Sequence, residues 1–179
     1  MALKPTIYKA TVALSDMDRH HYDNLQLTLA RHPSETLERM MVRLLAFCFQ
    51  AREGLQFGKG LSTAEEADLL AHELDGRLAL WIDVGEPAVD RIRKACRIAE
   101  QVFVYSFNSK APIWWSQNAS DFAALDVVVS RFDWDQVQAL SVLATRTMDL
   151  SVTISGDTAW VAMEQGSCEL ALEILQSSE

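Results

Sequence analysis

DLLAHELDGRLALWIDV, residues 68–84, contains two apolar runs, 68–74 and 77–84, on either side of Asp75-Gly76. An Asp-Gly pair between apolar runs is a strong signal for a hairpin turn. The second run is nearly continuous in apolar side chains, as expected of a central strand that is buried on both faces. The segment therefore predicts a β-hairpin whose second strand lies inside a sheet.

Two carboxylates, Asp68 and Asp83, lie at the open end of this hairpin. Positions equally distant from the turn face each other across an antiparallel pair, so these two residues are directly opposed. Opposed Cβ atoms lie only about 4.5–5.5 Å apart, and two carboxylates that close repel unless one is protonated or a cation lies between them. The same spacing also fits two strand-end acids that point apart into water.

A third acid, Glu38, lies in a predicted helix that begins at Pro33-Ser34, with Ser34 as N-cap, and ends near Gly54. Its neighbours along the same flank are apolar, so Glu38 points toward the sheet. Three converging carboxylates would form an oxygen cage for Mg²⁺ or Mn²⁺. The alternative is that Glu38, like Glu35, only stabilises the positive end of the helix dipole.

The rest of the chain alternates between strand and helix patterns. Further strands are predicted over 5–15, 20–30, 101–107, 125–130, 148–154, 158–164 and 167–174, and further helices from Pro87 onward, over 112–118 and over 133–145. We therefore expect an α/β protein with a mixed central sheet flanked by helices and with additional antiparallel strands at both ends of the chain. No linker divides the sequence, so a single domain is expected over 1–179.

The formal net charge of the 179-residue chain is -9, and it is unevenly distributed. Residues 1–97 hold 13 Lys or Arg against 14 Asp or Glu, whereas residues 98–179 hold 3 against 11. This negative charge disfavours nonspecific binding along a nucleic acid, although residues 1–97 would repel DNA or RNA much less than residues 98–179. One dense basic patch stands out: Arg91, Arg93, Lys94 and Arg97. Taken alone, such a patch also fits a solvated helix face.

The sequence also bears on the compartment. The cysteines Cys48, Cys96 and Cys168 are scattered and odd in number, which suits a reducing cytoplasm and excludes a CxxC-type metal site. No apolar run reaches the length needed to span a membrane, and the N-terminus lacks the pattern of a secretion signal. We expect a cytoplasmic monomer that has no membrane partner.

Several segments resemble the YaeQ family of small bacterial proteins. They are RHPSETLERMMVRLLAF at 31–47, EADL at 66–69, ALWIDVGEPAVDRIRKA at 79–95, FNSKAPIWWSQN at 107–118 and ATRTMDL at 144–150. The resemblance implies a variation on the restriction-endonuclease-like fold of the PD-(D/E)XK nuclease superfamily. In that pattern Glu38 resembles the helix glutamate, Asp68 the acid that opens a strand, and Asp83 the first acid of (D/E)XK.

The sequence departs from the superfamily pattern at two positions. Ala67 replaces the proline, and Gly85 stands where the pattern has its lysine. Some superfamily members move a catalytic side chain to the following helix, where Arg91 and Lys94 are the candidates. At 100° per residue, Lys94 lies opposite the apolar stripe of that helix, and Arg91 lies on its flank.

The resemblance implies two functions of different classes. The first is a nuclease in which Asp68, Asp83 and Glu38 bind Mg²⁺ or Mn²⁺, the metal activates a water that attacks the phosphodiester, and Arg91 or Lys94 stabilises the developing charge. The second is a non-catalytic regulatory protein that binds nucleic acid or protein on a degenerate nuclease fold. The absence of lysine at Gly85 favours the second, and the opposed acids favour the first.

Overall fold

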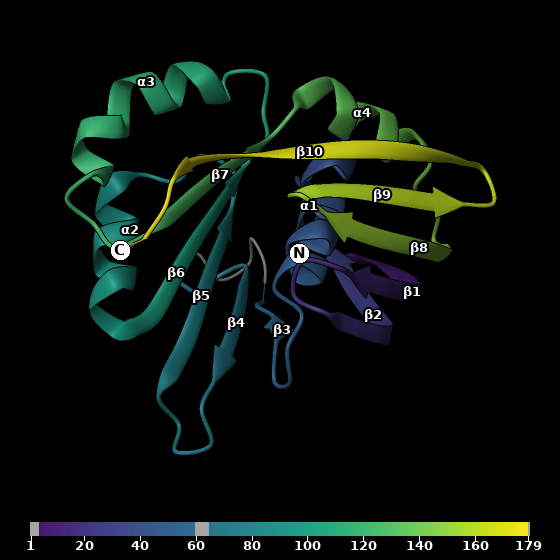
Figure 1. Cartoon of the computed structure of the whole chain (residues 1–179), viewed down its shortest axis with the longest axis horizontal. Coiled ribbons are helices and arrows are strands. Elements are labelled where there is room, and N and C mark those ends of the chain that lie inside the picture. Colours follow the sequence, from purple (N-terminus) through teal and green to yellow (C-terminus); the bar gives the residue numbers. More distant parts are fainter. Residues whose placement is uncertain (1–3, 60–64, 179) are drawn as a thin grey trace.

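The computed structural model describes residues 4–59 and 65–178. Over these residues ten strands form one sheet in the order β2-β1-β8-β9-β10-β7-β6-β5-β4-β3 (Figure 1). The strands are β1 Thr6–Asp16, β2 His21–Arg31, β3 Gln56–Phe57, β4 Leu69–His72, β5 Leu78–Val84, β6 Ala99–Ser106, β7 Val128–Phe132, β8 Thr147–Ser155, β9 Thr158–Met163 and β10 Gly166–Gln176. The helices are α1 Leu37–Phe49, α2 Val89–Ile98, α3 Ala111–Phe122 and α4 Trp134–Val142.

The predicted hairpin at 68–84 is confirmed, and its register is as predicted from Leu69 to Ala71, whereas a bulge between Ala71 and His72 pairs His72 with Leu78, one residue away from the predicted partner. Leu69 pairs with Ile82 and Leu70 with Trp81, so the ladder runs toward an opposed Asp68 and Asp83. β5 continues into a parallel set with β6 and β7, as its apolar sequence predicts for a central strand. The two-residue strand β3, which the sequence analysis missed, adds an edge beyond β4.

The antiparallel pair at the N-terminus is also confirmed. β1 and β2 pair along all eleven residues without a bulge, from Thr6 opposite Arg31 to Asp16 opposite His21. The other side of β1 pairs in parallel with β8, which comes from the far end of the sequence. The N-terminal hairpin therefore joins the sheet beside the C-terminal strands.

A single long strand, β10, connects the two halves of the sheet. Residues 166–171 pair with β9, and residues 172–176 pair with β7 with an irregularity near Ile174. Figure 1 shows β10, in yellow, running across the width of the molecule. The sheet curls along this strand, so that its two halves face α1.

The helix α1 is buried nearly all round, because every residue from Met40 to Phe49 is buried. Its N-cap is Thr36, whose hydroxyl accepts a hydrogen bond from the Arg39 N–H at 3.2 Å. The predicted N-cap, Ser34, is wrong: its hydroxyl lies 2.7 Å from His32 Nδ1 in the preceding turn.

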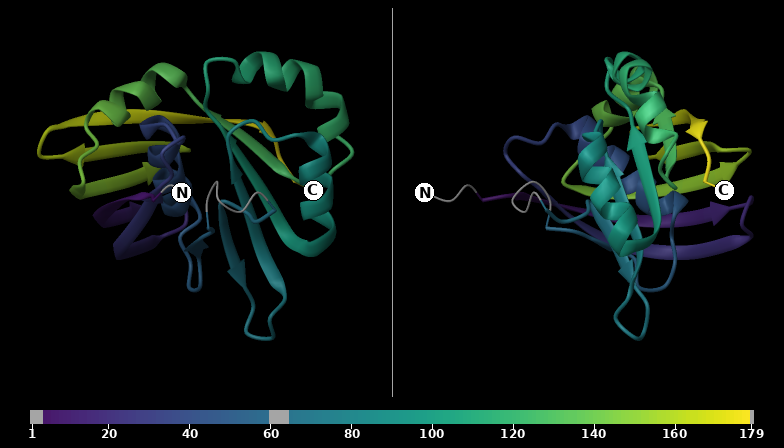
Figure 2. Two further views of the ribbon diagram at one scale, coloured as in Figure 1. Left: turned by 180° about the vertical axis from the view of Figure 1, so that it is seen from behind. Right: turned by 90° about the vertical axis from the view of Figure 1, so that its left-hand side faces the viewer.

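The helices cover both faces of the sheet, as predicted. The larger core contains α1 and residues of α4 together with strands from both halves of the sheet. The smaller core packs α2 and α3 against the outer face of β5 to β7 (Figure 2). A mixed sheet with helices on both faces is thus established, whereas the restriction-endonuclease-like core stays a prediction. Within the described residues no helix has both the length and the apolar character to cross a membrane.

Candidate functional site

Asp83 lies buried near the end of β5 and is held by two side chains. Arg91, in the first turn of α2, donates from Nε to Oδ2 at 2.6 Å and from Nη2 to Oδ1 at 3.2 Å. Trp81 donates from its indole N–H to Oδ1 at 3.0 Å, and its ring lies 5.4 Å below the Arg91 guanidinium. Burial raises the pKa of Asp83, the Arg91 hydrogen bond opposes this, and the charge of Asp68 adds to it.

Asp68 is held by the backbone and by a second arginine. Its Oδ2 accepts the Val84 N–H at 2.7 Å, which fixes the carboxylate at the end of β5. Its Oδ1 accepts from Arg39 Nη2 at 2.7 Å, and Arg39 Nη1 lies 2.6 Å from Glu35 Oε2. Arg43 completes the chain with bonds of 2.9 and 2.7 Å to the two oxygens of Glu35. Positive and negative side chains thus alternate from Arg43 on α1, through Glu35 and Arg39, to Asp68 at the sheet.

Glu38 points away from this chain of charges. Its Oε1 accepts a long hydrogen bond, 3.4 Å, from the Ser141 hydroxyl on α4. The structure therefore brings Asp68 and Asp83 together and leaves Glu38 at the α1–α4 contact. No group of three His, Cys, Asp or Glu side chains within 4–59 and 65–178 is placed to hold a metal ion. The predicted three-carboxylate cage does not fit this arrangement.

The two basic candidates on α2 differ as the helical wheel predicts. Arg91 reaches back to Asp83, whereas Lys94 is exposed. The backbone conformation at position 85 explains why no lysine stands there. The φ of Gly85 is +116°, a conformation that favours glycine, and the Gly85 N–H donates to the backbone carbonyl of Tyr105 at 2.8 Å. The backbone turn out of β5 thus needs a residue without a side chain at this position.

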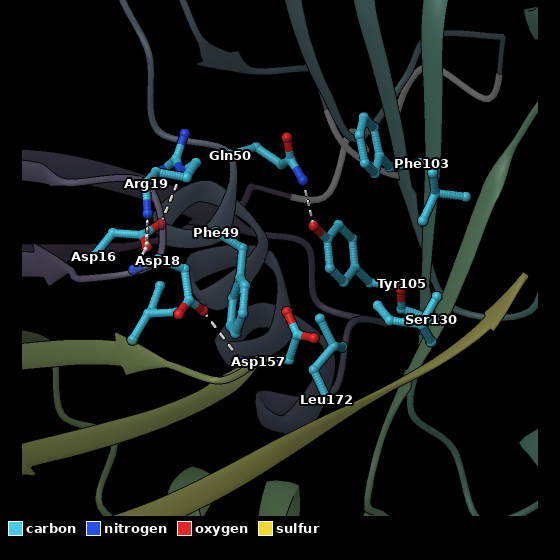
Figure 3. A pocket seen from close by; sticks show the side chains of 13 residues that line it. Asp16, Asp18, Arg19, Phe49, Gln50, Phe103, Tyr105, Ser130, Asp157 and Leu172 are labelled. Atoms are coloured by element: carbon cyan, nitrogen blue, oxygen red, sulfur yellow. Dashed lines mark hydrogen bonds and ion pairs between the residues drawn. The ribbon is translucent and has the colours of Figure 1, made fainter. Parts of the chain in front are cut away.

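A second candidate site lies at the other end of α1. A pocket of about 200 Å³ lies between the end of α1, the turn after β1, the turn after β8, and the strands β6, β7 and β10. Figure 3 shows the side chains that line it. The pocket opens where β10 passes from β9 to β7, and the Leu172 N–H donates to the Asp157 carbonyl at 2.9 Å beside it. The pocket is therefore a consequence of the sheet topology.

Hydrogen bonds fix the positions of the acidic side chains at the rim of the pocket. Asp16 Oδ2 accepts from Arg19 Nε at 2.7 Å, and Arg19 also donates to the carbonyls of Cys48 in the last turn of α1 and of Ala51 just beyond it. Asp18 accepts the N–H groups of Gly156 at 2.9 Å and Asp157 at 3.2 Å, and these two bonds hold its pKa below the ordinary value. Two β-turns from distant parts of the sequence are thereby tied together.

The interior of the pocket is aromatic and carries two hydroxyl groups. The Tyr105 hydroxyl accepts from Gln50 Nε2 at 2.7 Å, and burial raises the pKa of this phenol well above its usual range. Ser130 is only 2% exposed and lines the same wall. Both hydroxyls are therefore neutral hydrogen-bonding groups in a largely apolar cavity.

Sequence reasoning found neither the arginine partners of the two acids nor this pocket. Arg91 was a candidate for catalysis, but Arg39 and Arg43 were overlooked, although an arginine every four residues beside Glu35 is a signal for ion pairs along a helix. The pocket draws its side chains from six separate segments, so no local spacing marks it.

Comparison with known proteins gives one consistent family. The family model described as YaeQ protein matches residues 1–172. The YaeQ protein of Escherichia coli (strain K12) is 44% identical over 180 residues, and that of Salmonella typhi is 43% identical over 178, each match covering 98% of both chains. The crystal structure of YaeQ from Xanthomonas axonopodis pv. citri is similar with a TM-score of 0.94 at 38% identity, covering 97% of this chain and 99% of that one.

Proposed function

The chain belongs to the YaeQ family, and we propose that it is a non-catalytic regulatory protein that binds another protein, with its nuclease-like acid pair serving stability. The observation that carries this proposal is the pairing of each acid with an arginine of the same chain: Asp68 with Arg39, and Asp83 with Arg91.

These ion pairs occupy the oxygens that a metal would use. Asp83 accepts hydrogen bonds on both oxygens, and so does Asp68. A divalent ion would have to displace two guanidinium groups that the chain itself holds in place. Removing a partner from a buried ion pair is costly, because the remaining charge is left without compensation. The arginines therefore favour a structural role for the acids.

The surface charge favours a protein over a nucleic acid as the partner. The net charge is -9, and it is concentrated after residue 97. Binding to DNA or RNA draws most of its affinity from Lys and Arg contacts to phosphates. An acidic chain repels such a partner, whereas a protein surface imposes no single sign of charge.

The outer edge of β2 is the surface that we propose for this partner. The backbone N–H of Lys9 donates to the backbone carbonyl of Arg146, next to β8. Lys9 and the other odd-numbered residues of β1 therefore direct their N–H and C=O groups toward β8. The even-numbered residues of β1 then form backbone hydrogen bonds with the odd-numbered residues of β2. The even-numbered residues of β2 present their N–H and C=O groups to the opposite, unpaired edge.

Part of this edge is already used by the chain itself. The Ala30 carbonyl accepts from Arg43, and the Asn24 N–H donates to Asp23. Within the described residues no strand pairs with this edge of β2, which includes Gln26 and Thr28. Long edge strands usually carry charges, proline or a bulge that block pairing, and residues 24–30 have none of these. An extended segment of a partner protein fits such an edge.

The non-catalytic assignment is tested by metal and substrate together. Thermal melting of the wild type should not shift with millimolar Mg²⁺ or Mn²⁺, because residues 4–59 and 65–178 contain no group of three acidic, His or Cys side chains placed to hold a metal ion. The same protein should leave single- and double-stranded DNA and RNA intact. A metal-dependent shift that disappears in Asp68→Ala, or nicking that disappears in Asp83→Ala, would contradict the proposal.

The docking edge is tested by affinity capture with matched variants. Thr28→Pro removes an N–H from the free edge, and Ser151→Ala alters an exposed side chain on β8, which β1 separates from β2. A protein partner should be captured by the wild type and by Ser151→Ala but not by Thr28→Pro. Hydrogen exchange in the complex should slow at Gln26 and Thr28. Capture by all three proteins, or protection elsewhere, would reject this edge.

Metal-dependent hydrolysis of nucleic acid is the second candidate, and one observation favours it. The charge of Asp68 raises the pKa of Asp83, so the two carboxylates lie close enough to interact. Such a pair is the start of a cation site if Arg39 and Arg91 move aside. The melting and cleavage experiments above distinguish this candidate from the binding protein.

A further inference from the structure

The pocket at the C-terminal end of α1 has a net negative rim. Asp16 is neutralised by Arg19, which leaves the charges of Asp18 and Asp157. Asp18 stays ionised because two backbone N–H groups bond to it. The carboxylate of Asp157 is exposed, and among the described residues it has no ion-pair or hydrogen-bond partner. A ligand that reaches the rim therefore meets two uncompensated carboxylates.

The interior offers ring faces and an unused hydroxyl. Phe49 and Tyr105 lie with ring centroids 6.3 Å apart, and Phe103 lines the same cavity (Figure 3). Ser130 is only 2% exposed, and in the described part of the chain no hydrogen bond joins its hydroxyl to another residue. Because the Ser130 oxygen is not fully enclosed, it remains open to a polar atom of a bound molecule.

The size and the charge of the pocket limit the chemical class of ligand. A cavity of about 200 Å³ corresponds to about seven waters at about 30 Å³ each, so it can enclose one small ring and leaves the charged end of a ligand at the rim. The acidic rim repels anions, including nucleotides. Cations are attracted both to carboxylates and to the faces of aromatic rings. A metal ion fits poorly, because no three ligand side chains converge within the described residues.

We propose that this pocket binds a small organic ammonium compound with a short apolar body and a hydrogen-bonding group at its far end. The ammonium group lies between Asp18 and Asp157, and the body packs against Phe49 and Phe103. The far group bonds to the hydroxyls of Tyr105 and Ser130. This site is separate from the Asp68–Asp83 pair at the opposite end of α1, so it stands or falls independently of the proposed function.

The test compares three molecules of the same shape and different charge by NMR titration of the full-length protein. They are tyramine, its neutral alcohol analogue tyrosol, and the carboxylate 4-hydroxyphenylacetate, all of which carry a two-carbon side chain on the phenol ring. Tyramine should bind at least about tenfold more tightly than tyrosol, because only it gains from the two carboxylates. The carboxylate should bind most weakly, and amide shifts should centre on the residues that line the pocket. High salt should reduce the preference for tyramine.

Two variants and one control locate the binding. Asp157→Asn keeps a residue type that tolerates the φ of +59° at this position, and it should reduce the preference for tyramine by about threefold or more. Ser130→Ala should weaken tyramine and tyrosol by similar factors, because it removes a hydrogen bond that both make. Asp149→Asn, an exposed acid on β8 outside the pocket, should change neither.

Three results would overturn the proposal. The first is no saturable shift with tyramine at millimolar concentration. The second is equal or tighter binding of the carboxylate. The third is tyramine binding that is unaffected by both Asp157→Asn and Ser130→Ala while both variants keep the melting temperature of the wild type.

Discussion

Arg91 and Asp83 form a two-point ion pair, with Nε 2.6 Å from Oδ2 and Nη2 3.2 Å from Oδ1. The acid lies near the end of β5, and the arginine lies in the first turn of the helix that follows. The guanidinium also donates to the Glu66 carbonyl at 2.8 Å, and so connects the end of β5 with the segment that leads into β4. The cation at this strand end is therefore supplied by the chain itself.

Arg91→Ala should lower the free energy of unfolding by about 2–3 kcal/mol, because it leaves the Asp83 carboxylate buried without its cation. The value is below the usual cost for fully buried pairs, since the Arg91 side chain is 30% exposed. Urea unfolding of the variant measures it. Lys94→Ala, an exposed substitution on the same helix, is the control and should change stability by less than about 0.5 kcal/mol. Equal effects of the two variants would mean that the pair is not stabilising.

Asp83→Asn should alter the pH dependence of stability. Burial raises the pKa of Asp83, so the folded protein binds this proton more readily than the unfolded chain does. The resulting stabilisation is present below the ordinary carboxyl pKa and is lost as the pH rises through the raised value. The melting temperature of Asp83→Asn relative to wild type should therefore increase as the pH rises above the ordinary carboxyl pKa.

The control for this experiment is Asp149→Asn, which replaces an exposed acid and should give a difference with little pH dependence. A relative melting temperature of Asp83→Asn that falls as the pH rises would mean that the hydrogen bonds from Arg91 and Trp81 outweigh burial. The pKa of Asp83 would then be lowered and not raised.

Cys48 should resist alkylation in the folded protein. It is fully buried in α1, and burial raises the pKa of its thiol to about 12. The thiolate that reacts with iodoacetamide is therefore both scarce and inaccessible. Cys96 and Cys168 are only partly buried and should be labelled first. Mass spectrometry after short labelling, with and without denaturant, measures the order. Early labelling of Cys48 would show that α1 opens in the native state.

Proline substitutions should test which backbone groups of β2 face the free edge. Thr28→Pro removes an N–H that points away from β1 and should cost less than about 1 kcal/mol. Asp23→Pro, at another exposed position, removes an N–H that bonds to β1 and should cost on the order of 2 kcal/mol or more. Thermal unfolding of both variants gives the comparison. A larger loss for Thr28→Pro would reverse the assignment of the two edges.

The local parts of the fold were predictable from sequence. The Asp75-Gly76 turn predicts the hairpin and the opposition of Leu69 and Ile82, but it does not predict the bulge between Ala71 and His72, which shifts the register by one residue next to the turn. The position of β10 was not predictable. Its sequence marks a strand, but nothing in it tells that one half pairs with β9 and the other with β7. Such pairings depend on contacts between distant segments.

The candidate site was also predictable only where its residues lie on one local element. Spacing alone placed Asp68 and Asp83 together, since both lie on one hairpin. Glu38 was assigned to the same site from its apolar flank, but α4 packs on that flank and supplies Ser141 as its neighbour. The partner of each acid comes from a helix whose packing angle the sequence does not specify, so Arg39 remained unrecognised and Arg91 was assigned a different role.

The late position of β10 in the chain has a consequence for biosynthesis. While a ribosome is still translating residues 166–176, the segments on either side of this strand have no shared backbone partner. β8, which β1 pairs with in parallel, is also made more than a hundred residues after β1. The first hairpin of the nascent polypeptide therefore lacks its β8 neighbour until residues 147–155 have been made, and it is most exposed to chaperones and proteases during that interval.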